Sequence, residues 1–375
     1  MNKYIIMYKE IVKDKLRNTD IKINGNRPWD ILVKDERFYS YVLQKESMGL
    51  GESYMFGWWE CKDLEGFLFR IIRMNPTKKQ FKFTKIWWYY FKAKVINRQT
   101  KNKSINVADI HYNIGNDLYE KMLGNTMIYS CGYWRNASDL DKAQNDKLDL
   151  ICRKLKLQSG DRVLDIGCGW GGFAKYASIN YGVEVVGITI SEEQFRYARQ
   201  NCQGLNVDIR LIDYRDIDEK FDKVASIGMF EHVGYKNYQQ FMNKVNLCMK
   251  DDGLFLLHTI GSTTDMIATD PWIDKYIFPG GMIPSAPQIV RAFESTFVLE
   301  DWHSLGMDYK RTIHEWQTNF GEHWIDLKDK YGTNFYKMWM YYLSISAASF
   351  RAKSNNLWQI VLSKKGNIID YQSER

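Results

Sequence analysis

From about residue 111 onward, short apolar runs alternate with amphipathic stretches. The intervals between the runs mostly show the apolar spacing of helices, whereas the runs themselves have the length of buried strands. Because strand and helix alternate, we expect the strands to pair in parallel and to be covered by helices on both faces. The pattern therefore predicts an α/β domain, with strands at residues 161–166, 183–188, 207–212, 222–228, 253–260 and 357–362.

The hydrophobic pattern also divides the chain into regions. Residues 1–95 are predicted to form a small, mostly helical domain, and the polar, basic residues 96–110 a linker to the α/β domain of residues 111–375. The segment at about 262–350 is too long for a simple crossover, so we expect it to cover a substrate site beside the sheet edge. No apolar run reaches the length of about 18 residues that a membrane-spanning helix needs.

The first predicted strand ends in a turn rich in glycine, V-L-D-I-G-C-G-W-G-G at 163–172, and a helical pattern follows. Glycine lets the backbone approach a ligand closely, and the N-terminus of the helix offers free N–H groups to an anion. The turn therefore predicts a nucleotide-cofactor pocket. Its acid and its glycines are Asp165, Gly167, Gly169, Gly171 and Gly172.

A nicotinamide dinucleotide is one alternative for this pocket, because the spacing fits G-x-G-x-x-G. However, an acid precedes the first glycine by two residues, and strand 183–188 runs into Thr189 where a dehydrogenase has a ribose-binding acid. The pattern resembles motif I of class I S-adenosylmethionine (SAM) methyltransferases instead. A tight turn without a ligand is the other alternative, which four glycines in six positions disfavour.

Positive charge is concentrated at the N-terminal end of the chain. Residues 1–110 hold 22 Lys+Arg and 12 Asp+Glu, whereas the remaining residues hold 30 and 33. Segment 66–108 has eleven basic residues, nine aromatic residues and no acid. Such a segment suits an anionic membrane surface or a nucleic acid, and a solvated basic face over aromatic core residues is the simpler alternative. The six cysteines form no C-x-x-C pair and the histidines show no metal-ligand spacing, which favours a reducing cytoplasm and predicts no metal site.

Several longer motifs point to one family. Together with the glycine turn, they resemble the cyclopropane fatty acid synthase family, the phospholipid-modifying relatives of the mycolic acid methyltransferases. The motifs are G-L-G-E-S-Y-M at 49–55, H-Y-N-I-G-N-D-L-Y at 111–119, Y-S-C-G-Y-W at 129–134, M-F-E-H-V-G at 229–234, L-H-T-I-G-S at 257–262 and D-Y-K-R-T at 308–312. The resemblance implies a Rossmann-like class I methyltransferase fold, with a seven-stranded, mostly parallel sheet and a small helical N-terminal domain that associates with lipid.

The resemblance also implies a reaction. Members of the family transfer a SAM methyl group to a cis double bond of an unsaturated phospholipid chain, and a bound bicarbonate deprotonates the resulting carbocation so that a cyclopropane ring closes. The implied partners are a phospholipid in an anionic membrane and a second copy of the chain, with no nucleic acid. The implied location is cytoplasmic, at the inner face of the membrane. The bicarbonate cage maps onto Cys131, Glu231, His258, the backbone of Ile260, and Tyr309.

For SAM, the resemblance carries over a second set of residues. Thr189 and Gln194 would replace the usual ribose-binding acid, and Tyr214 offers an aromatic face to adenine. A cation gains nothing beside a sulfonium, so whether Arg215 contacts SAM through its side chain is left open. The implied cofactor site comprises Tyr129, Ser130, Asp165, Gly167, Gly169, Gly171, Gly172, Thr189, Gln194, Tyr214, Arg215 and Ile227.

Other interpretations stay open at this point. Cys131 and His258, taken alone, would be ordinary core residues, whereas Glu231 follows a strand at the edge where ligands of parallel sheets bind. A methyl-branching lipid or small-molecule methyltransferase would share the fold, although the filled cage argues against it. A nucleic-acid methyltransferase would need an amine-activating loop such as N-P-P-Y where this chain has M-F-E-H. A catalytically inactive lipid-binding relative would not need a complete cage.

Overall fold

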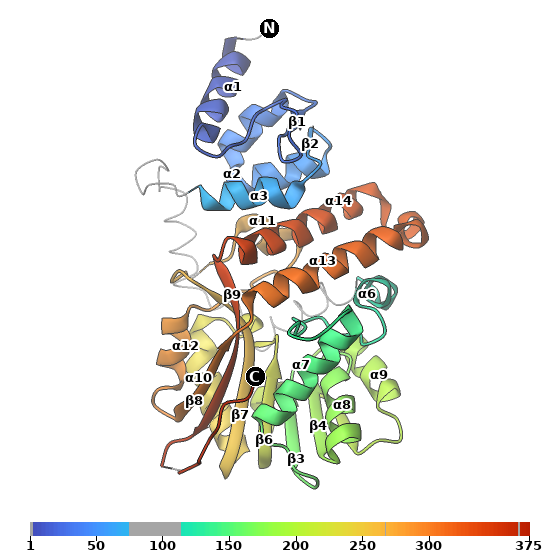
Figure 1. The fold of residues 1–375 in the computed structure, drawn as a ribbon, viewed down its shortest axis with the longest axis vertical. Coiled ribbons are helices and arrows are strands. Elements are labelled where there is room, and N and C mark those ends of the chain that lie inside the picture. Colours follow the sequence, from blue (N-terminus) through green and yellow to red (C-terminus); the bar gives the residue numbers. More distant parts are fainter. Residues whose placement is uncertain (1–2, 75–113, 267, 367) are drawn as a thin grey trace.

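The computed structural model describes residues 3–74, 114–266, 268–366 and 368–375 (Figure 1). At its centre lies a seven-stranded sheet with the order β5-β4-β3-β6-β7-β9-β8. Strands β3 to β7 pair in parallel, and β9 runs antiparallel to both β7 and β8. This confirms the predicted mostly parallel sheet. The strands are β3 (Arg162–Ile166), β4 (Glu184–Thr189), β5 (Val207–Leu211), β6 (Phe221–Ile227), β7 (Met249–Ser262), β8 (Phe297–Ser304) and β9 (Asn355–Lys364).

Helices cover both faces of the sheet because successive strand residues point to opposite sides. Val163 and Val185 pack in a core with α7 (Leu140–Lys154), α8 (Gly172–Tyr181) and α9 (Glu192–Asn201). Leu164 and Val186 pack in a second core with α10 (Tyr238–Cys248) and α12 (Ala286–Phe293). Strands β3, β4 and β9 are buried along nearly their whole length because helices cover both faces of the sheet there.

One strand was absent from the sequence expectation. The edge strand β8 lies within 262–350, the segment predicted to be a cover, and α12 lies there as well. The β8 sequence F-V-L-E-D-W-H-S is largely exposed or half-buried and carries Glu300 and Asp301, so it lacks the continuous apolar run of the central strands. An edge strand with one covered face gives a weaker pattern than a buried one.

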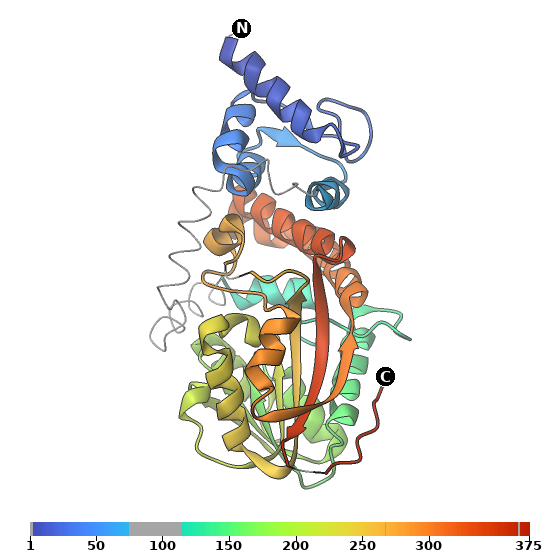
Figure 2. The ribbon, with the colours of Figure 1, turned by 90° about the vertical axis from the view of Figure 1, so that its left-hand side faces the viewer.

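The rest of that segment lies above the carboxyl ends of the strands. It comprises α11 (Pro271–Tyr276), α13 (Gly306–Glu322) and α14 (Trp324–Arg351), and α6 (Asn116–Leu123) packs against α13 (Figure 1). These helices separate the sheet from the N-terminal elements, as the view turned by 90° shows (Figure 2). Among the described helices, none has the length and apolarity to cross a bilayer.

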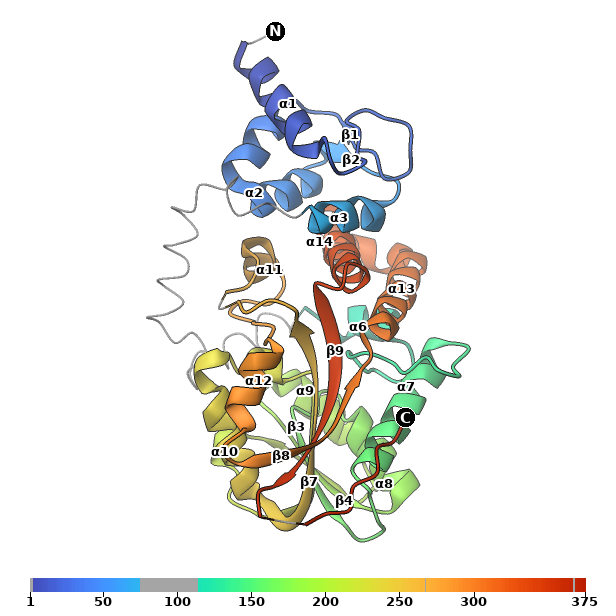
Figure 3. The same cartoon turned by 60° about the vertical axis from the view of Figure 1, so that its left-hand side comes forward.

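The N-terminal elements are mostly helical and pack on this upper layer. They are α1 (Lys3–Leu16), β1 (Leu32–Val33), α2 (Arg37–Met55), β2 (Trp59–Glu60) and α3 (Leu64–Arg73). Helix α3 packs on α14, and α2 packs on both α14 and α11 (Figure 3). Trp59 of this region and Trp272, Trp316 and Trp339 of the upper layer share one continuous apolar core. The predicted boundary at residue 95 and the linker 96–110 lie outside the described residues.

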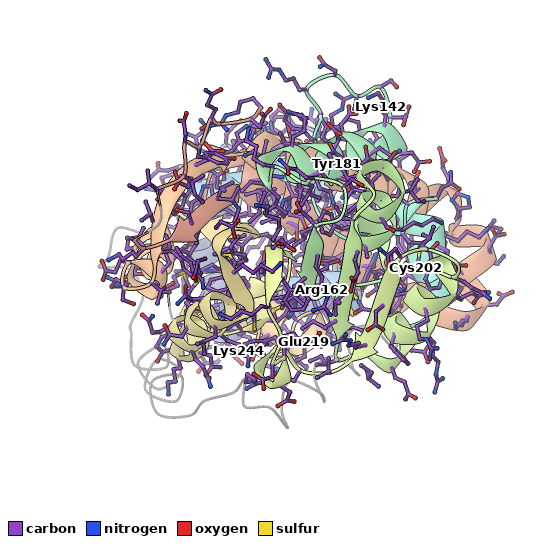
Figure 4. The ribbon with its side chains drawn as sticks, turned by 90° about the horizontal axis from the view of Figure 1, so that it is seen from below. Lys142, Arg162, Tyr181, Cys202, Glu219 and Lys244 are labelled. Atoms are coloured by element: carbon purple, nitrogen blue, oxygen red, sulfur yellow. The ribbon has the colours of Figure 1, made fainter. Side chains whose placement is uncertain are left out.

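The opposite end of the sheet carries surface ion pairs. Figure 4 views this end and labels Arg162 and Glu219. Arg162, the first residue of β3, bonds Glu219 at 2.5 Å and Glu184 at 2.8 Å. The ligand-binding features predicted from the sequence therefore have to be sought at the other, carboxyl end of the strands.

Candidate active site

A cavity of about 180 Å³ lies at the carboxyl ends of β3, β4 and β6. The loop 279–281, which follows α11, forms part of its wall. Residues from separate sequence motifs meet here, as expected for the ligand edge of a parallel sheet. The predicted cofactor residues that line it are Tyr129, Ser130, Asp165, Gly167, Gly169, Gly172, Thr189, Gln194, Tyr214, Arg215 and Ile227.

Gly171 is the one predicted cofactor residue that does not line the cavity. It caps the N-terminus of α8 with a φ of 85°, and a Cβ there would lie 3.0 Å from Cys202 Sγ. Its role in this structure is therefore a close approach between α8 and α9. Gly169, in contrast, has a φ of 55°, and no atom lies within 4 Å of the position that a Cβ would take, so its bare backbone faces open space.

Two buried charges lie together on the cavity wall. Asp165 is 1% exposed, and among the described residues neither of its carboxyl oxygens has a hydrogen-bond partner. Lys147 of α7 is also 1% exposed, and its Nζ donates to Ser130 Oγ at 3.1 Å. Burial raises the pKa of Asp165 to about 7 and lowers the pKa of Lys147 to about 7. Such opposed shifts at a cavity are typical of functional sites.

Polar side chains at the tip of β4 suit a ribose. Thr189 Oγ1 donates to Gln194 Oε1 at 2.9 Å, and both residues are buried at the cavity. On the neighbouring wall, Arg215 forms a two-pronged pair with Asp213, at 2.7 Å for each prong. The pair engages Nε and Nη2 of the guanidinium, so the Arg215 side chain has a partner within the protein. Tyr129 Oη lies 2.7 Å from Tyr342 Oη of α14.

Glu231 and His258 are buried next to residues that line the cavity: Met229 and His232 lie on either side of Glu231 in the chain, and Ile227 is the strand partner of His258. Glu231 Oε1 accepts a hydrogen bond from the Ile260 N–H at 2.6 Å, and Oε2 has no partner among the described residues. Burial raises the pKa of Glu231 to about 7. The resemblance assigned the backbone of Ile260 to the bicarbonate, and in this structure the N–H of that backbone is engaged by Glu231.

His258 is held in one tautomer by a neighbour. Gln359 Nε2 lies 3.3 Å from His258 Nδ1, and because the amide nitrogen is a donor, Nδ1 accepts and the ring proton lies on Nε2. Burial, reinforced by Lys147 and Lys154, lowers the pKa of His258 well below its ordinary value. The residue is therefore a neutral donor whose buried Nε2 has no partner in the described part of the chain.

Cys131 and Tyr309 are brought to the same region by α13. Cys131 Sγ lies 3.9 Å from the Leu305 carbonyl, and the Tyr309 N–H donates to that carbonyl at 3.3 Å. Burial raises the pKa of Cys131 well above its ordinary value, so it is a neutral thiol and no nucleophile. Leu305 in turn bonds Leu357 of β9, the strand neighbour of Ile260.

The five predicted cage residues lie on η2 (Phe230–His232), β7, α13 and the loop before α7, and none of them lines the cavity itself. Residues close to them in the sequence do line it: Ser130 precedes Cys131, and Met229 and His232 lie on either side of Glu231. Sequence reasoning missed Lys147 and Gln359. Each had a signal: Lys147 falls on the apolar face of its helix, four residues after Ala143, and Gln359 interrupts the apolar strand L-W-Q-I-V-L.

Comparison with known proteins shows the family of the chain. The family model described as mycolic acid cyclopropane synthetase matches residues 98–360. The cyclopropane-fatty-acyl-phospholipid synthase of Escherichia coli (strain K12) is 47% identical over 357 residues, covering 94% of this chain and 93% of that protein. A probable fatty acid methyltransferase of Pseudomonas putida is 34% identical and covers 89% of this chain and 86% of its own length.

A solved structure gives the same result. The cyclopropane synthase MmaA2 of Mycobacterium tuberculosis superposes with a TM-score of 0.66 at 29% identity, covering 70% of this chain and 98% of that one. The chain therefore belongs to the mycolic acid cyclopropane synthetase family and has the fold of class I SAM-dependent methyltransferases.

Proposed function

We propose that this protein transfers a methylene unit from SAM to the cis double bond of unsaturated phospholipid chains and so forms a cyclopropane ring. The identity of 47% to an enzyme named for this activity supports the proposal. The observation that carries it is local: the cavity at the glycine turn is lined by Met229 and His232, on either side of Glu231 in the chain, and by Ile227, the strand partner of His258. Glu231 and His258 are buried, and each keeps one unpartnered polar atom among the described residues.

The lining residues fit SAM. When bound, SAM supplies an activated methyl group; the protein binds and orients it. The unpartnered oxygens of Asp165 suit an ammonium group, and the Thr189–Gln194 pair suits ribose hydroxyls. Tyr214 lines the cavity and offers an aromatic face to adenine.

The cage residues fit bicarbonate. Glu231 Oε2 is an acceptor for its O–H, and the His258 Nε2–H is a donor for its oxygens. When bound, bicarbonate supplies a small anionic base. Glu231 and His258 are 8% and 0% exposed, so the site excludes water, which would otherwise add to a cation on the acyl chain.

The N-terminal region is proposed to contact an anionic membrane. The described part of the region shows an apolar face on α1, where Tyr4, Met7 and Ile11 are 66%, 47% and 39% exposed at helical spacing. Lys13 and Lys15 lie in the last turn of the same helix. An apolar face with nearby lysines is typical of helices that lie in the membrane interface. This supports a peripheral membrane protein. That the protein acts as a homodimer is proposed from the resemblance alone.

The test is incubation of the purified protein with vesicles of monounsaturated phospholipid and labelled SAM, followed by mass analysis of the acyl chains. We expect each modified chain to gain one methylene and to resist mild hydrogenation. A methyl-branched or methylene product would indicate the alternative of a fatty acid methyltransferase. Label recovered in RNA, DNA or a free small molecule would contradict the proposal.

A further inference from the structure

The motif G-L-G-E-S-Y-M at 49–55 has no part in the cofactor cavity, yet it follows a sharp distortion of the backbone. It lies in α2, which kinks at Glu46, a non-glycine residue with φ 52° and ψ −125°. A non-glycine residue in such a region of φ/ψ space is strained and persists only where its surroundings impose it. The kink turns the second half of α2 against α14 and α11.

The contact with α11 is made by two neighbouring residues, Gly51 and Glu52, which we name the α2 latch. A Cβ on Gly51 would lie 2.4 Å from Trp272 Nε1, so only glycine permits this approach. Glu52 is 4% exposed, and its Oε1 accepts from Lys275 Nζ at 2.7 Å and from Tyr276 Oη at 2.8 Å. Its Oε2 accepts from Tyr41 Oη within α2.

The Glu52 carboxylate accepts hydrogen bonds from three side chains. Burial opposes its ionisation, but hydrogen bonds from Lys275, Tyr41 and Tyr276 outweigh that cost and lower the pKa of Glu52 to about 2. Glu52 therefore stays charged at all ordinary pH values, and removing its partners would leave a buried charge unpaired. The latch is thus a polar contact that fixes the position of α11 rather than a solvated surface pair.

Helix α11 leads directly into the cavity wall. Residues 279–281 line the cavity, and the Gly280 N–H donates to Asp274 Oδ1 of α11 at 2.8 Å. Met282 directly follows this loop, and its N–H donates to the backbone carbonyl of Glu231 at 2.8 Å. A continuous set of contacts thus joins the latch to the loop and the loop to Glu231. Contiguous packed and hydrogen-bonded residues of this kind can couple separate sites.

We propose that Glu52 is a positioning residue for the cavity: through Lys275 and Tyr276 it holds α11, and with it the loop 279–281 and the backbone of Glu231, in the geometry that binds the cofactor. The proposal rests on the proposed function only in naming that cofactor as SAM. It assigns to the N-terminal region a role in the cofactor site as well as in contact with lipid.

The test compares Glu52→Gln, Tyr276→Phe and the double variant with the wild-type full chain. Tyr276→Phe removes only the α11 hydroxyl that donates to Glu52, so it is the mildest change. Calorimetry measures the Kd for S-adenosylhomocysteine without lipid, and the vesicle assay measures KM and kcat. We expect each single variant to raise that Kd by roughly 2- to 30-fold, the range of coupling between packed sites, and the double variant to fall short of the product of the two effects.

Asp30→Asn is the matched control. Asp30 is a buried carboxylate of the same region, 6% exposed and bonded by Arg27, but it makes no contact with α11 among its described hydrogen bonds. It should lower the melting temperature without changing the Kd. If Glu52→Gln, Tyr276→Phe and the double variant lower the melting temperature but leave the Kd unchanged, the proposal is overturned. A wild-type protein that binds S-adenosylhomocysteine but makes no cyclopropane would overturn the proposed function alone.

Discussion

At the scale of single residues, the cavity region is unusual for its buried ionisable groups. Asp165, Lys147 and Glu231 each have a pKa of about 7, and in each case burial is the largest cause. A buried charge without a full set of partners destabilises the fold. The protein tolerates that cost at the place where a charged ligand is proposed to bind.

Asp165→Asn should therefore stabilise the protein in a way that depends on pH. Because the pKa of Asp165 is raised in the fold, its contribution to stability is complete below about pH 4 and is lost as the pH rises towards 7. The neutral amide of the variant does not ionise, so its free energy of unfolding does not fall in this way. The stability of the variant relative to the wild type should therefore grow between about pH 4 and 7, to at most about 4 kcal/mol at about 1.4 kcal/mol per pKa unit. Thermal unfolding across a pH series measures it.

Asp301→Asn is the matched control with the opposite sign. Hydrogen bonds from Arg375 and Lys154 outweigh burial and lower the pKa of Asp301 to about 2. Its stabilisation is present above about pH 4 and is lost as the pH falls towards 2, so the variant should be destabilised at neutral pH. Melting temperatures of the two variants that moved in the same direction at pH 7 would contradict this account of the buried charges.

Glu231→Gln should separate chemistry from cofactor binding. The amide keeps the size of the side chain but removes the charge that accepts the O–H of the proposed bicarbonate. Turnover on lipid vesicles should fall by roughly 10²–10⁴-fold, the usual effect of losing a positioned acid–base group, while the calorimetric affinity for SAM stays near normal. A parallel collapse of SAM affinity would place Glu231 in the cofactor site.

At the scale of elements, the turn between β3 and α8 can be tested by filling it. A valine at Gly169 would project into the cavity, where no protein atom lies within 4 Å of the new Cβ. The positive φ of 55° strains any side chain at this position, so we expect Gly169→Val to fold with reduced stability and to lose measurable affinity for SAM. Gly204→Val is the control, because Gly204 also has a positive φ, 80°, and open space around it, but lies away from the cavity. Equal affinities of the two variants would contradict the assignment of the turn.

The elements also show which features a sequence can predict. The central strands and the glycine turn were predictable because a buried parallel strand is a continuous apolar run and a turn against a ligand needs glycine. The edge strand β8, with Glu300 and Asp301, has neither property. Lys147 and Gln359 acquire a role only because folding places α7 and β9 beside the site, which residue spacing along the chain does not encode.

At the scale of the whole molecule, the proposed membrane contact depends on charge. Lys78, Lys79, Lys82 and Lys85 lie outside the described residues, so this expectation rests on the sequence. Replacing all four by Gln should weaken binding to anionic vesicles by at most about 1 kcal/mol per lysine. Charges are screened over about 8–10 Å at physiological ionic strength and over shorter distances at higher salt, so the loss should shrink as salt is added. Activity on detergent-dispersed substrate should survive. Co-sedimentation with anionic vesicles measures the binding. If the bound fraction changes neither with salt nor with the four substitutions, electrostatic docking is contradicted.

The most direct test of the central claim follows the hydrogens of the transferred methyl group. SAM that carries three deuterons on this methyl is incubated with the wild-type protein and monounsaturated phospholipid vesicles, and the acyl chains are analysed by mass. Ring closure after loss of one proton to a base predicts that two deuterons remain in a product that resists hydrogenation. A product that keeps all three deuterons as a methyl branch, or one that takes up hydrogen, would contradict the account.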